Sequence, residues 1–368
     1  MSKRRVLVTG ATGFLGGAFL AVPRPEEVRI EWLLPARGED QADAERRVAK
    51  RLGRFLSGSV LERALASCKV FPADLTDPNA FDDASLEGVT HVIHLAANTS
   101  FVSSKGVWEM NFQVTKALAE RLRRVPTLER FLYVGTAMIC GDEPPHVVHE
   151  DASPSESVKH LVPYTASKSG AEAMLRAEFA DLPLVVARPS IVIGHTQLGC
   201  GPSGSIFWVV RALERARLIS GNVDAGVDVV PVDYVAKALD HLLFSHRLAH
   251  DTYHVSAGSE ARTPIRELAR RFAEVKGERY EPDSYQVTRA EDLSQHRGRL
   301  TEAFGPGHGR RLQLALGLYL RFCELNVAFD NSRLRAEGLP PSPTLIDYLD
   351  VCLAHSHDDI IAQADDEI

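Results

Sequence analysis

A tyrosine and a lysine four residues apart are the pair of side chains in this sequence best suited to catalysis. Tyr164 is the first and Lys168 the last residue of the run Tyr-Thr-Ala-Ser-Lys, which begins a predicted helix over 164–179. Residues four apart lie one above the other on a helix face. Hydride transfer to a carbonyl leaves an alkoxide that needs a proton, and a phenol can supply one. We expect Tyr164 to be that acid and the Lys168 charge to lower the pKa of its phenol.

A glycine-rich turn near the start of the chain is the second feature with chemical meaning. The stretch 9–16 reads Thr-Gly-Ala-Thr-Gly-Phe-Leu-Gly and joins a predicted strand to a predicted helix. Its glycines permit a tight turn, close approach of the backbone to a pyrophosphate, and close helix–strand packing. Phosphates would lie at the helix N-terminus, where free N–H groups favour anions. The cofactor-binding residues predicted from this turn are Gly10, Thr12, Gly13, Phe14, Leu15 and Gly16.

Short apolar runs that alternate with helical patterns predict the scaffold for these residues. The expected strands lie at 5–9, 28–34, 69–71, 91–95, 131–134 and 184–187, and the expected helices at 13–20, 40–56, 105–124 and 164–179. Apolar strands alternating with helices indicate a parallel sheet that is covered on both faces. The predicted fold class is a doubly wound α/β sheet of the Rossmann kind, with a smaller and mostly helical C-terminal substrate-binding part.

The alternating pattern loosens after about residue 195. We expect 1–195 to form the dinucleotide-binding domain, with 225–256 returning to it, and 196–224 and 257–368 to form the substrate-binding part. The segment 280–310 is polar without a clear period. The segment 311–325 is apolar on nearly every face, which favours a buried helix over a lid or a membrane-touching helix.

Composition excludes several classes of protein. The net charge of −7 and the pI of about 6.1 argue against a nucleic-acid partner. Five cysteines without a C-x-x-C spacing predict neither a disulfide framework nor a metal site, since only Cys352, His355 and His357 cluster in sequence. No run is long enough for a transmembrane segment, and a strand begins soon after Met1. We therefore expect a cytoplasmic enzyme.

The G-x-x-G-x-x-G spacing resembles that of the extended short-chain dehydrogenase/reductases, and the likeness continues in order over roughly residues 5–240. The run 73–75 resembles the turn after the third strand, where an Asp meets the adenine. The run 94–97 resembles the turn that lies under the cofactor, and 188–194 the segment that contacts the nicotinamide. The further cofactor-binding residues that the resemblance implies are Asp74, Leu75, Ala96, Ala97, Pro189 and Ile191, together with Tyr164 and Lys168.

The same resemblance implies two more catalytic residues. Thr136 stands where the family has the Ser or Thr that polarises the substrate carbonyl, and its hydroxyl would donate to the developing oxyanion. Asn111 stands where an Asn helps to hold the active-site backbone. Cys140 departs from the Tyr or Asn often found there, which puts the shape of the substrate site in doubt.

The end of the second strand bears on the choice of dinucleotide. NAD sites usually place an acid there, whereas this chain has Arg37 with Glu39 and Asp40 beyond it. A guanidinium suits a 2′-phosphate, and Arg47 on the following helix could assist. The sequence therefore favours NADP(H) over NAD(H), the alternative being that Arg37 is an exposed loop residue.

Three features resemble the fatty acyl-CoA and thioester reductase-like branch, the male-sterility type. They are Arg37 with the arginine-rich segment 42–52 behind it, Phe101 after the strand-four alanines, and Pro-Val-Asp-Tyr-Val at 231–235. The resemblance implies an NADPH-dependent reductase of an acyl thioester, on CoA or an acyl carrier protein, or of the derived aldehyde. The alternatives are a ketone or aldehyde reductase of a small hydrophobic substrate, a nucleotide-sugar epimerase or dehydratase, and a noncatalytic NADP-sensing module. A homodimer remains open.

Overall fold

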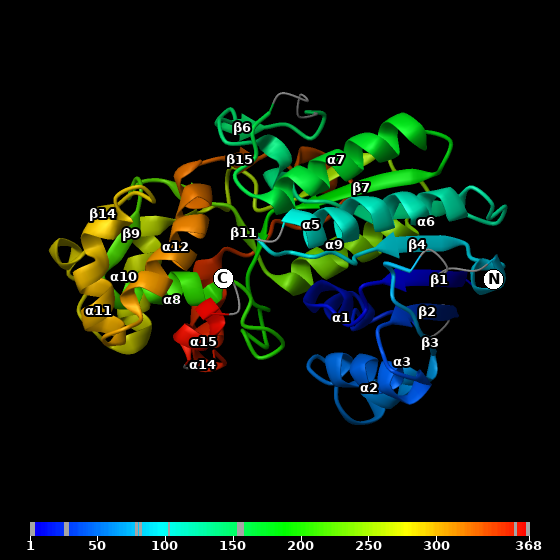
Figure 1. Cartoon of the computed structure of the whole chain (residues 1–368), viewed down its shortest axis with the longest axis horizontal. Coiled ribbons are helices and arrows are strands. Elements are labelled where there is room, and N and C mark those ends of the chain that lie inside the picture. The colour runs from blue at the N-terminus through cyan, green and yellow to red at the C-terminus, as the bar shows by residue number, and fades with distance from the viewer. Residues whose placement is uncertain are drawn as a thin grey trace.

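Seven parallel strands form the central sheet of the computed structural model, which describes residues 4–25, 29–77, 80, 83–101, 104–152, 158–356 and 359–365. In spatial order the strands are β12 (Thr252–Val255), β7 (Leu184–Pro189), β5 (Arg130–Val134), β4 (His91–His94), β1 (Arg4–Thr9), β2 (Ile30–Ala36) and β3 (Cys68–Pro72). Every neighbouring pair is parallel. The predicted doubly wound sheet is confirmed (Figure 1).

The direction of winding reverses between β1 and β4. From β1 the chain builds β2 and β3 on one side, then crosses to β4 on the other side. In open α/β sheets, ligands bind at the carboxyl ends of the strands beside such a reversal. Gly10 follows β1 and Ala96 follows β4, so both stand at this point.

Helices cover both faces of the sheet. On one face, α1 (Phe14–Leu20) packs against α2 (Gln41–Leu52) and α9 (Val232–Phe244). On the other face, α7 (Pro163–Glu178) packs against α5 (Ser104–Trp108) and α6 (Val114–Leu122). Adjacent residues of β1 belong to different core clusters, Val6 and Val8 to one and Leu7 to the other. This is why the strands read as continuous apolar runs.

Two predicted helices differ from those observed. The helix expected over 40–56 ends at Leu52, because Gly53 caps it and the following turn is stabilised by shorter-range hydrogen bonds; a separate α3 (Gly58–Ala66) follows. The helix expected over 105–124 is interrupted by a π-helical turn, Glu109–Gln113, between α5 and α6. The expected start of the second strand at 28 lies outside the described residues.

A smaller, largely helical part lies beyond the carboxyl ends of the sheet strands (Figure 1). Its helices are α8 (Phe207–Arg215), α10 (Ile265–Lys276), α11 (Arg297–Phe304), α12 (Gly309–Glu324), α14 (Leu349–Ala354) and α15 (Ile360–Asp365), whereas α13 (Ser332–Ala336) packs against β12 of the central sheet. Short strand pairs join β8 (Ile191–Val192) to β11 (Val229–Val230), β9 (Leu218–Ser220) to β14 (Gln286–Thr288), β10 (Gly226–Val227) to β13 (Thr263–Pro264), and β6 (Val147–Val148) to β15 (Ala328–Phe329). The short helix α4 (Asp83–Leu86) precedes β4.

The segment without a clear period, 280–310, contains β14 and α11. Only Leu300 is buried among the eight residues of α11, so no apolar stripe marked this helix in the sequence. The helix expected over 311–325 is confirmed as α12, and it is buried along one side. Among the described residues, no helix has the length and apolar character required to cross a bilayer.

Candidate active site

The glycine-rich turn packs directly on the turn after β4. Gly10 has φ +75°, and a Cβ on it would lie 2.6 Å from the backbone nitrogen of Ala96. The amide of Gly13 donates to the Gly10 carbonyl at 2.9 Å, and a Cβ on Gly16 would overlap that same carbonyl. Gly10 and Gly16 therefore permit a conformation and a packing that larger residues would prevent. Thr12, Phe14 and Leu15 on the rim of the turn are only half-buried.

The ends of β2 and β3 bring Arg37 and Asp74 together. Arg37 Nε lies 3.8 Å from Asp74 Oδ1, and both side chains are exposed. Hydrogen bonds from the backbone amide and hydroxyl of Thr76 hold the pKa of Asp74 below its usual range, and the Arg37 charge adds to this. An ionised Asp74 is suited to accept from a donor on the cofactor, and Leu75 follows it at the same edge.

Arg47 faces a basic cleft of about 510 Å³ beside the glycine-rich turn. The lining consists of Thr12, Arg47, Lys50, Arg51, Arg54 and residues 201–203, without a carboxylate among them. Arg51 donates to the Thr12 carbonyl at 2.8 Å and to the Pro202 carbonyl at 3.1 Å, which ties α2 to both loops. Arg37 is not among the lining residues. Sequence reasoning missed Lys50, Arg51 and Arg54 as separate site residues, although the arginine-rich segment was visible.

Three of the four predicted catalytic side chains come from two elements that meet at the end of β5. Thr136 follows β5 and caps a short 3₁₀ turn; its hydroxyl accepts from the Met138 amide and donates to the Pro189 carbonyl, both at 3.3 Å. Tyr164 lies in the first turn of α7, and Lys168 one turn later donates to the Val134 carbonyl at 2.8 Å. Thr136 and Tyr164 line one apolar cavity of about 270 Å³.

Burial decides the protonation of the tyrosine and the lysine. It raises the pKa of Tyr164 to about 12 and lowers the pKa of Lys168 to about 7. The expectation that Lys168 would lower the pKa of the phenol is wrong for this structure, because removal from water disfavours the charged forms of both residues. Tyr164 therefore keeps its proton at neutral pH, which is the state that an acid requires.

Asn111 belongs to the π-helical turn and connects the β4 side of the site to the catalytic helix. Its Oδ1 accepts from the Asn98 amide at 2.8 Å, and its Nδ2 donates to the Asn98 carbonyl and the Ser167 hydroxyl, both at 2.9 Å. Ser167 directly precedes Lys168. Turns of π-helix occur frequently at functional sites, and here the turn aims an amide at the segment after β4 and at the catalytic helix.

A buried polar chain that sequence reasoning missed continues from Asn111 to the glycine-rich turn. The Thr115 hydroxyl donates to the Asn111 carbonyl, so His94 Nε2 must donate to Thr115 Oγ1, and its Nδ1 accepts from Thr9. Thr9 Oγ1 in turn accepts from the amides of Leu95 and Ala96. Burial lowers the pKa of His94 to about 3, which keeps the imidazole neutral and fixes this one pattern of donors.

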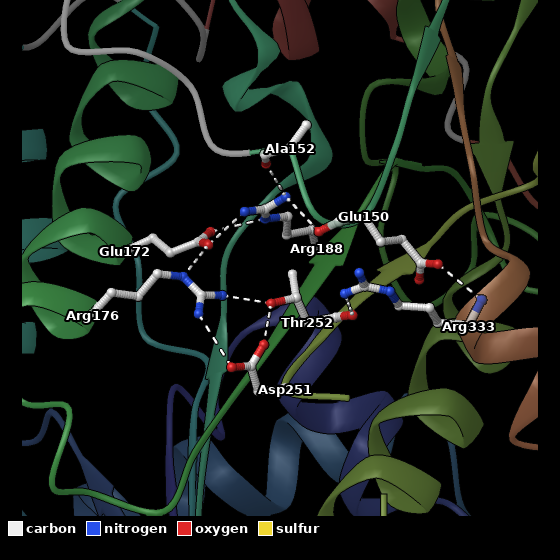
Figure 2. Close-up of polar contacts among 8 residues, drawn as sticks. All are labelled: Glu150, Ala152, Glu172, Arg176, Arg188, Asp251, Thr252 and Arg333. Carbon is white, nitrogen blue, oxygen red and sulfur yellow. Dashed lines mark hydrogen bonds and ion pairs between the residues drawn. The ribbon is translucent and has the colours of Figure 1, made fainter. Parts of the chain in front are cut away.

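A buried ion pair holds the end of β7 against the catalytic helix (Figure 2). Arg188 donates to Glu172 through Nη2 at 2.6 Å and Nε at 3.0 Å, and its Nη1 donates to the Ala152 carbonyl at 3.0 Å. Arg176, one turn after Glu172, extends the network to Thr252 on β12. Pro189 and Ile191 come directly after this anchor. A larger polar cleft of about 800 Å³ adjoins Arg176 and Arg188, but none of the predicted catalytic or cofactor residues lines it.

The apolar cavity is closed by residues that are distant in sequence. Phe101, after β4, lies 6.3 Å from the Tyr164 ring and 4.9 Å and 5.4 Å from Tyr319 and Phe322 of α12, measured between ring centroids. Other walls come from residues 190–193, Ile206, Val209, Val210, Val227 and Val229. Sequence reasoning expected α12 to be buried but did not predict that it lines the site.

Among the residues that the structure describes, no three metal-ligating side chains gather at one point. Cys352 is buried and His355 is exposed on α14 and just after it, while His357 lies outside the described residues.

Residues 8–239 match the profile of the family described as Male sterility protein. Fatty acyl-CoA reductase 2 from Homo sapiens is 25% identical over 307 residues, covering 70% of this chain and 58% of the human protein. A Drosophila melanogaster protein described as a candidate fatty acyl-CoA reductase is 25% identical over 277 residues, covering 64% of this chain and 50% of that protein. The chain thus spans little more than half the length of these relatives.

Two solved structures share the fold. The terminal R domain of the myxalamid PKS-NRPS biosynthetic pathway has a TM-score of 0.74 at 19% identity, over 95% of this chain and 90% of that one. The R domain of a nonribosomal peptide synthetase from Mycobacterium tuberculosis has a TM-score of 0.73 at 22% identity, over 99% and 92%. The match to the family profile spans more than half of the chain. The chain therefore belongs to the male sterility protein family, a thioester reductase-like branch of the extended short-chain dehydrogenase/reductases, which are NAD(P)-dependent oxidoreductases.

Proposed function

We propose that this protein is an NADPH-dependent reductase that delivers hydride to the carbonyl carbon of an acyl thioester on CoA or an acyl carrier protein. The observation that carries the proposal is the apolar cavity onto which Thr136 and Tyr164 open. A nucleotide sugar would need polar partners, whereas hydrocarbon side chains form most of this lining. In balance, acyl thioester, NADPH and a proton give aldehyde, free thiol and NADP⁺.

Each catalytic residue has a part that follows from its surroundings. The Thr136 hydroxyl turns from the Pro189 carbonyl to the substrate oxygen and donates as negative charge develops there. Tyr164 supplies the proton to that oxygen. Lys168, held on the Val134 carbonyl, orients the start of α7 and contributes charge when protonated. Asn111 fixes the segment around Asn98 and the helix turn before Lys168.

The cofactor end fits a dinucleotide, because the glycine-rich turn leaves room that a Cβ would fill and Ala96 lies directly beneath it. The bound dinucleotide would supply the hydride. We expect Asp74 and Leu75 to meet the adenine, and Ala97, Pro189 and Ile191 to meet the nicotinamide end. We place the dinucleotide on 1–195 with 225–256, and the acyl part on 196–224 and 257–368.

Preference for NADPH rests on the cations beside the turn. Arg47 lines a cleft that carries three further cations and no carboxylate, and Arg37 lies at the end of β2. A hydrogen bond to a charged group contributes about 1.5–3 kcal/mol. We therefore expect Arg47→Ala to raise KM for NADPH roughly tenfold or more and to leave KM for NADH within about twofold.

The matched control for this test is Arg46→Ala. Arg46 is the preceding residue of α2 and also pairs with Asp43, at 2.9 Å, but does not line the cleft. Equal changes for the two cofactors in Arg47→Ala, or the same changes in Arg46→Ala, would contradict the preference.

The assay that tests the proposed function combines purified protein with NADPH or NADH and a panel of acyl-CoAs, aldehydes and UDP-sugars. Absorbance of the reduced nicotinamide follows the reaction. We expect acyl-CoAs to oxidise NADPH. Oxidation with aldehydes alone would overturn the thioester proposal, and turnover of a UDP-sugar without net cofactor change would overturn any reductase function.

A further inference from the structure

A second apolar cavity lies behind the one that holds Thr136 and Tyr164. We refer to the first as the catalytic cavity and to the second, of about 90 Å³, as the end cavity. The end cavity lies between α8, β9 and α10, within the largely helical part beyond the sheet (Figure 1). We propose that the end cavity receives the far end of the substrate's acyl chain and thereby selects chain length. This inference rests on the proposed function.

The two cavities are adjacent because they share a wall. Val209, Val210, Val227 and Cys323 line both of them. The first two belong to α8, Val227 ends β10 and Cys323 lies near the end of α12. All four side chains are small, and no charged group stands among them. A straight hydrocarbon chain that passes between these four side chains would meet no charged group at the wall.

The lining of the end cavity suits a hydrocarbon. Leu218, Ile219, Leu268, Ala269 and Phe272 are buried apolar residues in its wall. Apolar cavities of this kind favour apolar occupants over water. The chain end would thus remove its own apolar surface from water without displacing well-bound solvent.

Most of the polar atoms in this wall already have partners within the protein. Glu214 pairs with Lys276 and with Arg217. The Tyr285 hydroxyl accepts from Arg217 Nη1 at 2.7 Å. Among the described residues, the Ser220 hydroxyl has no hydrogen-bond partner, and Glu214 Oε1 has only its ion pair with Arg217 at 3.2 Å. The wall therefore offers a polar-ended or charged ligand little that it could bind.

The volumes translate into a chain length. If a methylene group occupies roughly the share of a liquid water, about 30 Å³, the catalytic cavity holds about nine such groups and the end cavity about three. Because the reacting carbonyl takes part of the catalytic cavity, a chain of about eight carbons reaches the wall and one of about twelve fills the end cavity. Each buried methylene should raise kcat/KM about fourfold until that point, with no gain beyond it.

Ala269→Phe tests the inference by filling the end cavity. Ala269 lines only the end cavity and lies on α10, away from the catalytic residues. We expect kcat/KM for hexanoyl-CoA to stay within about twofold of the wild-type value. For dodecanoyl-CoA, kcat/KM should fall about tenfold or more, because two or three methylene groups would no longer be buried. Arg270→Phe, which adds the same ring at the neighbouring exposed position, is the control and should change neither.

Ile265→Ala tests it in the opposite direction and serves if the filled variant does not fold. Ile265 lines only the end cavity, so its truncation should move the preferred acyl-CoA about two carbons longer. A chain-length profile identical in all variants, or an equal loss for hexanoyl-CoA and dodecanoyl-CoA, would overturn the inference.

A parallel series of straight-chain alkanals separates this inference from the proposed function. Alkanals turned over with the same length profile, alongside inert thioesters, would support the end cavity and contradict thioester reduction. Thioesters reduced with a flat profile would support the proposed function and contradict the end cavity.

Discussion

Burial shifts the pKa values of Tyr164 and Lys168 in opposite directions, and both shifts favour the uncharged side chain. An alkoxide is a stronger base than a phenolate, so a neutral phenol with a pKa of about 12 can still give it a proton. Removing water from the site thus preserves the acid instead of disabling it.

Replacing this phenol tests its part directly. We expect Tyr164→Phe to lower kcat about 10²- to 10⁴-fold, the usual contribution of a positioned acid, and to leave NADPH affinity nearly unchanged. Tyr280→Phe, which removes a hydroxyl outside the catalytic cavity, should keep full turnover. Steady-state kinetics with equilibrium cofactor binding measure both, and undiminished turnover in Tyr164→Phe would remove the assigned role.

Because Lys168 is buried, the free energy of unfolding should change with pH in the alkaline range. Its pKa is about 7 in the folded protein and about 10.4 in an unfolded chain, so between these values the unfolded state binds more protons. The free energy of unfolding should therefore rise with pH from about 7 to 10, by at most about 1.4 kcal/mol per pH unit, and gain nothing from this group below 7. Urea unfolding at pH 7.5 and 9.5 should show this rise in the wild type beyond that in Lys168→Met; parallel pH dependences would contradict the burial effect.

At the scale of elements, two buried polar networks set the distance of α7 from the sheet. Asn111 connects α7 to the segment after β4 through Ser167 and Asn98. Glu172 connects the same helix to β7 through Arg188. The catalytic residues lie between these two connections, so the helix cannot shift without breaking one of them.

The Asn111 side chain should contribute more to the free energy of unfolding than the Ser167 hydroxyl that it contacts. Asn111→Leu leaves the amide and carbonyl of Asn98 without their partner, at a cost of about 1–3 kcal/mol for each group that remains buried. Ser167→Ala removes two hydrogen bonds, from Asn111 Nδ2 and to the Tyr164 carbonyl, and leaves Asn98 paired, so it should cost about 1–2 kcal/mol. Denaturant unfolding of the two variants gives the comparison, and equal losses would show that the π-helical turn does not depend on this side chain.

The Arg188–Glu172 pair should be costly to break singly and cheaper to replace together. Arg188→Met leaves a buried carboxylate, a loss of about 3–5 kcal/mol in the free energy of unfolding. The double variant Arg188→Met with Glu172→Leu removes both charges and should recover a large part of that loss, although Arg176 then loses its Glu172 contact. A double variant less stable than Arg188→Met would contradict this account.

At the scale of the whole molecule, the sheet could be predicted and the acyl site could not. The strands are buried on both faces, so β1, β4, β5 and β7 appear in the sequence as apolar runs, and the turn after β1 carries its own glycine signature. The catalytic cavity is assembled from segments that no local pattern connects, such as Phe101 and α12. The basic cleft depends on Arg51 reaching Pro202, a contact between residues 151 positions apart. The sequence of the π-helical turn does not differ visibly from that of an ordinary helix. The contact that distinguishes it, between Asn111 and Asn98, forms only in the folded protein.

The coupling of NADPH oxidation to thioester cleavage is the central claim, and it can be measured directly. NADPH oxidation and the release of free CoA thiol, detected with a thiol-reactive dye, are followed together in one reaction with dodecanoyl-CoA. The account predicts equal initial rates, one thiol released for each NADPH oxidised, with both signals lost in Tyr164→Phe. NADPH oxidation without thiol release, or thiol release that persists without NADPH, would contradict the reductive cleavage of a thioester.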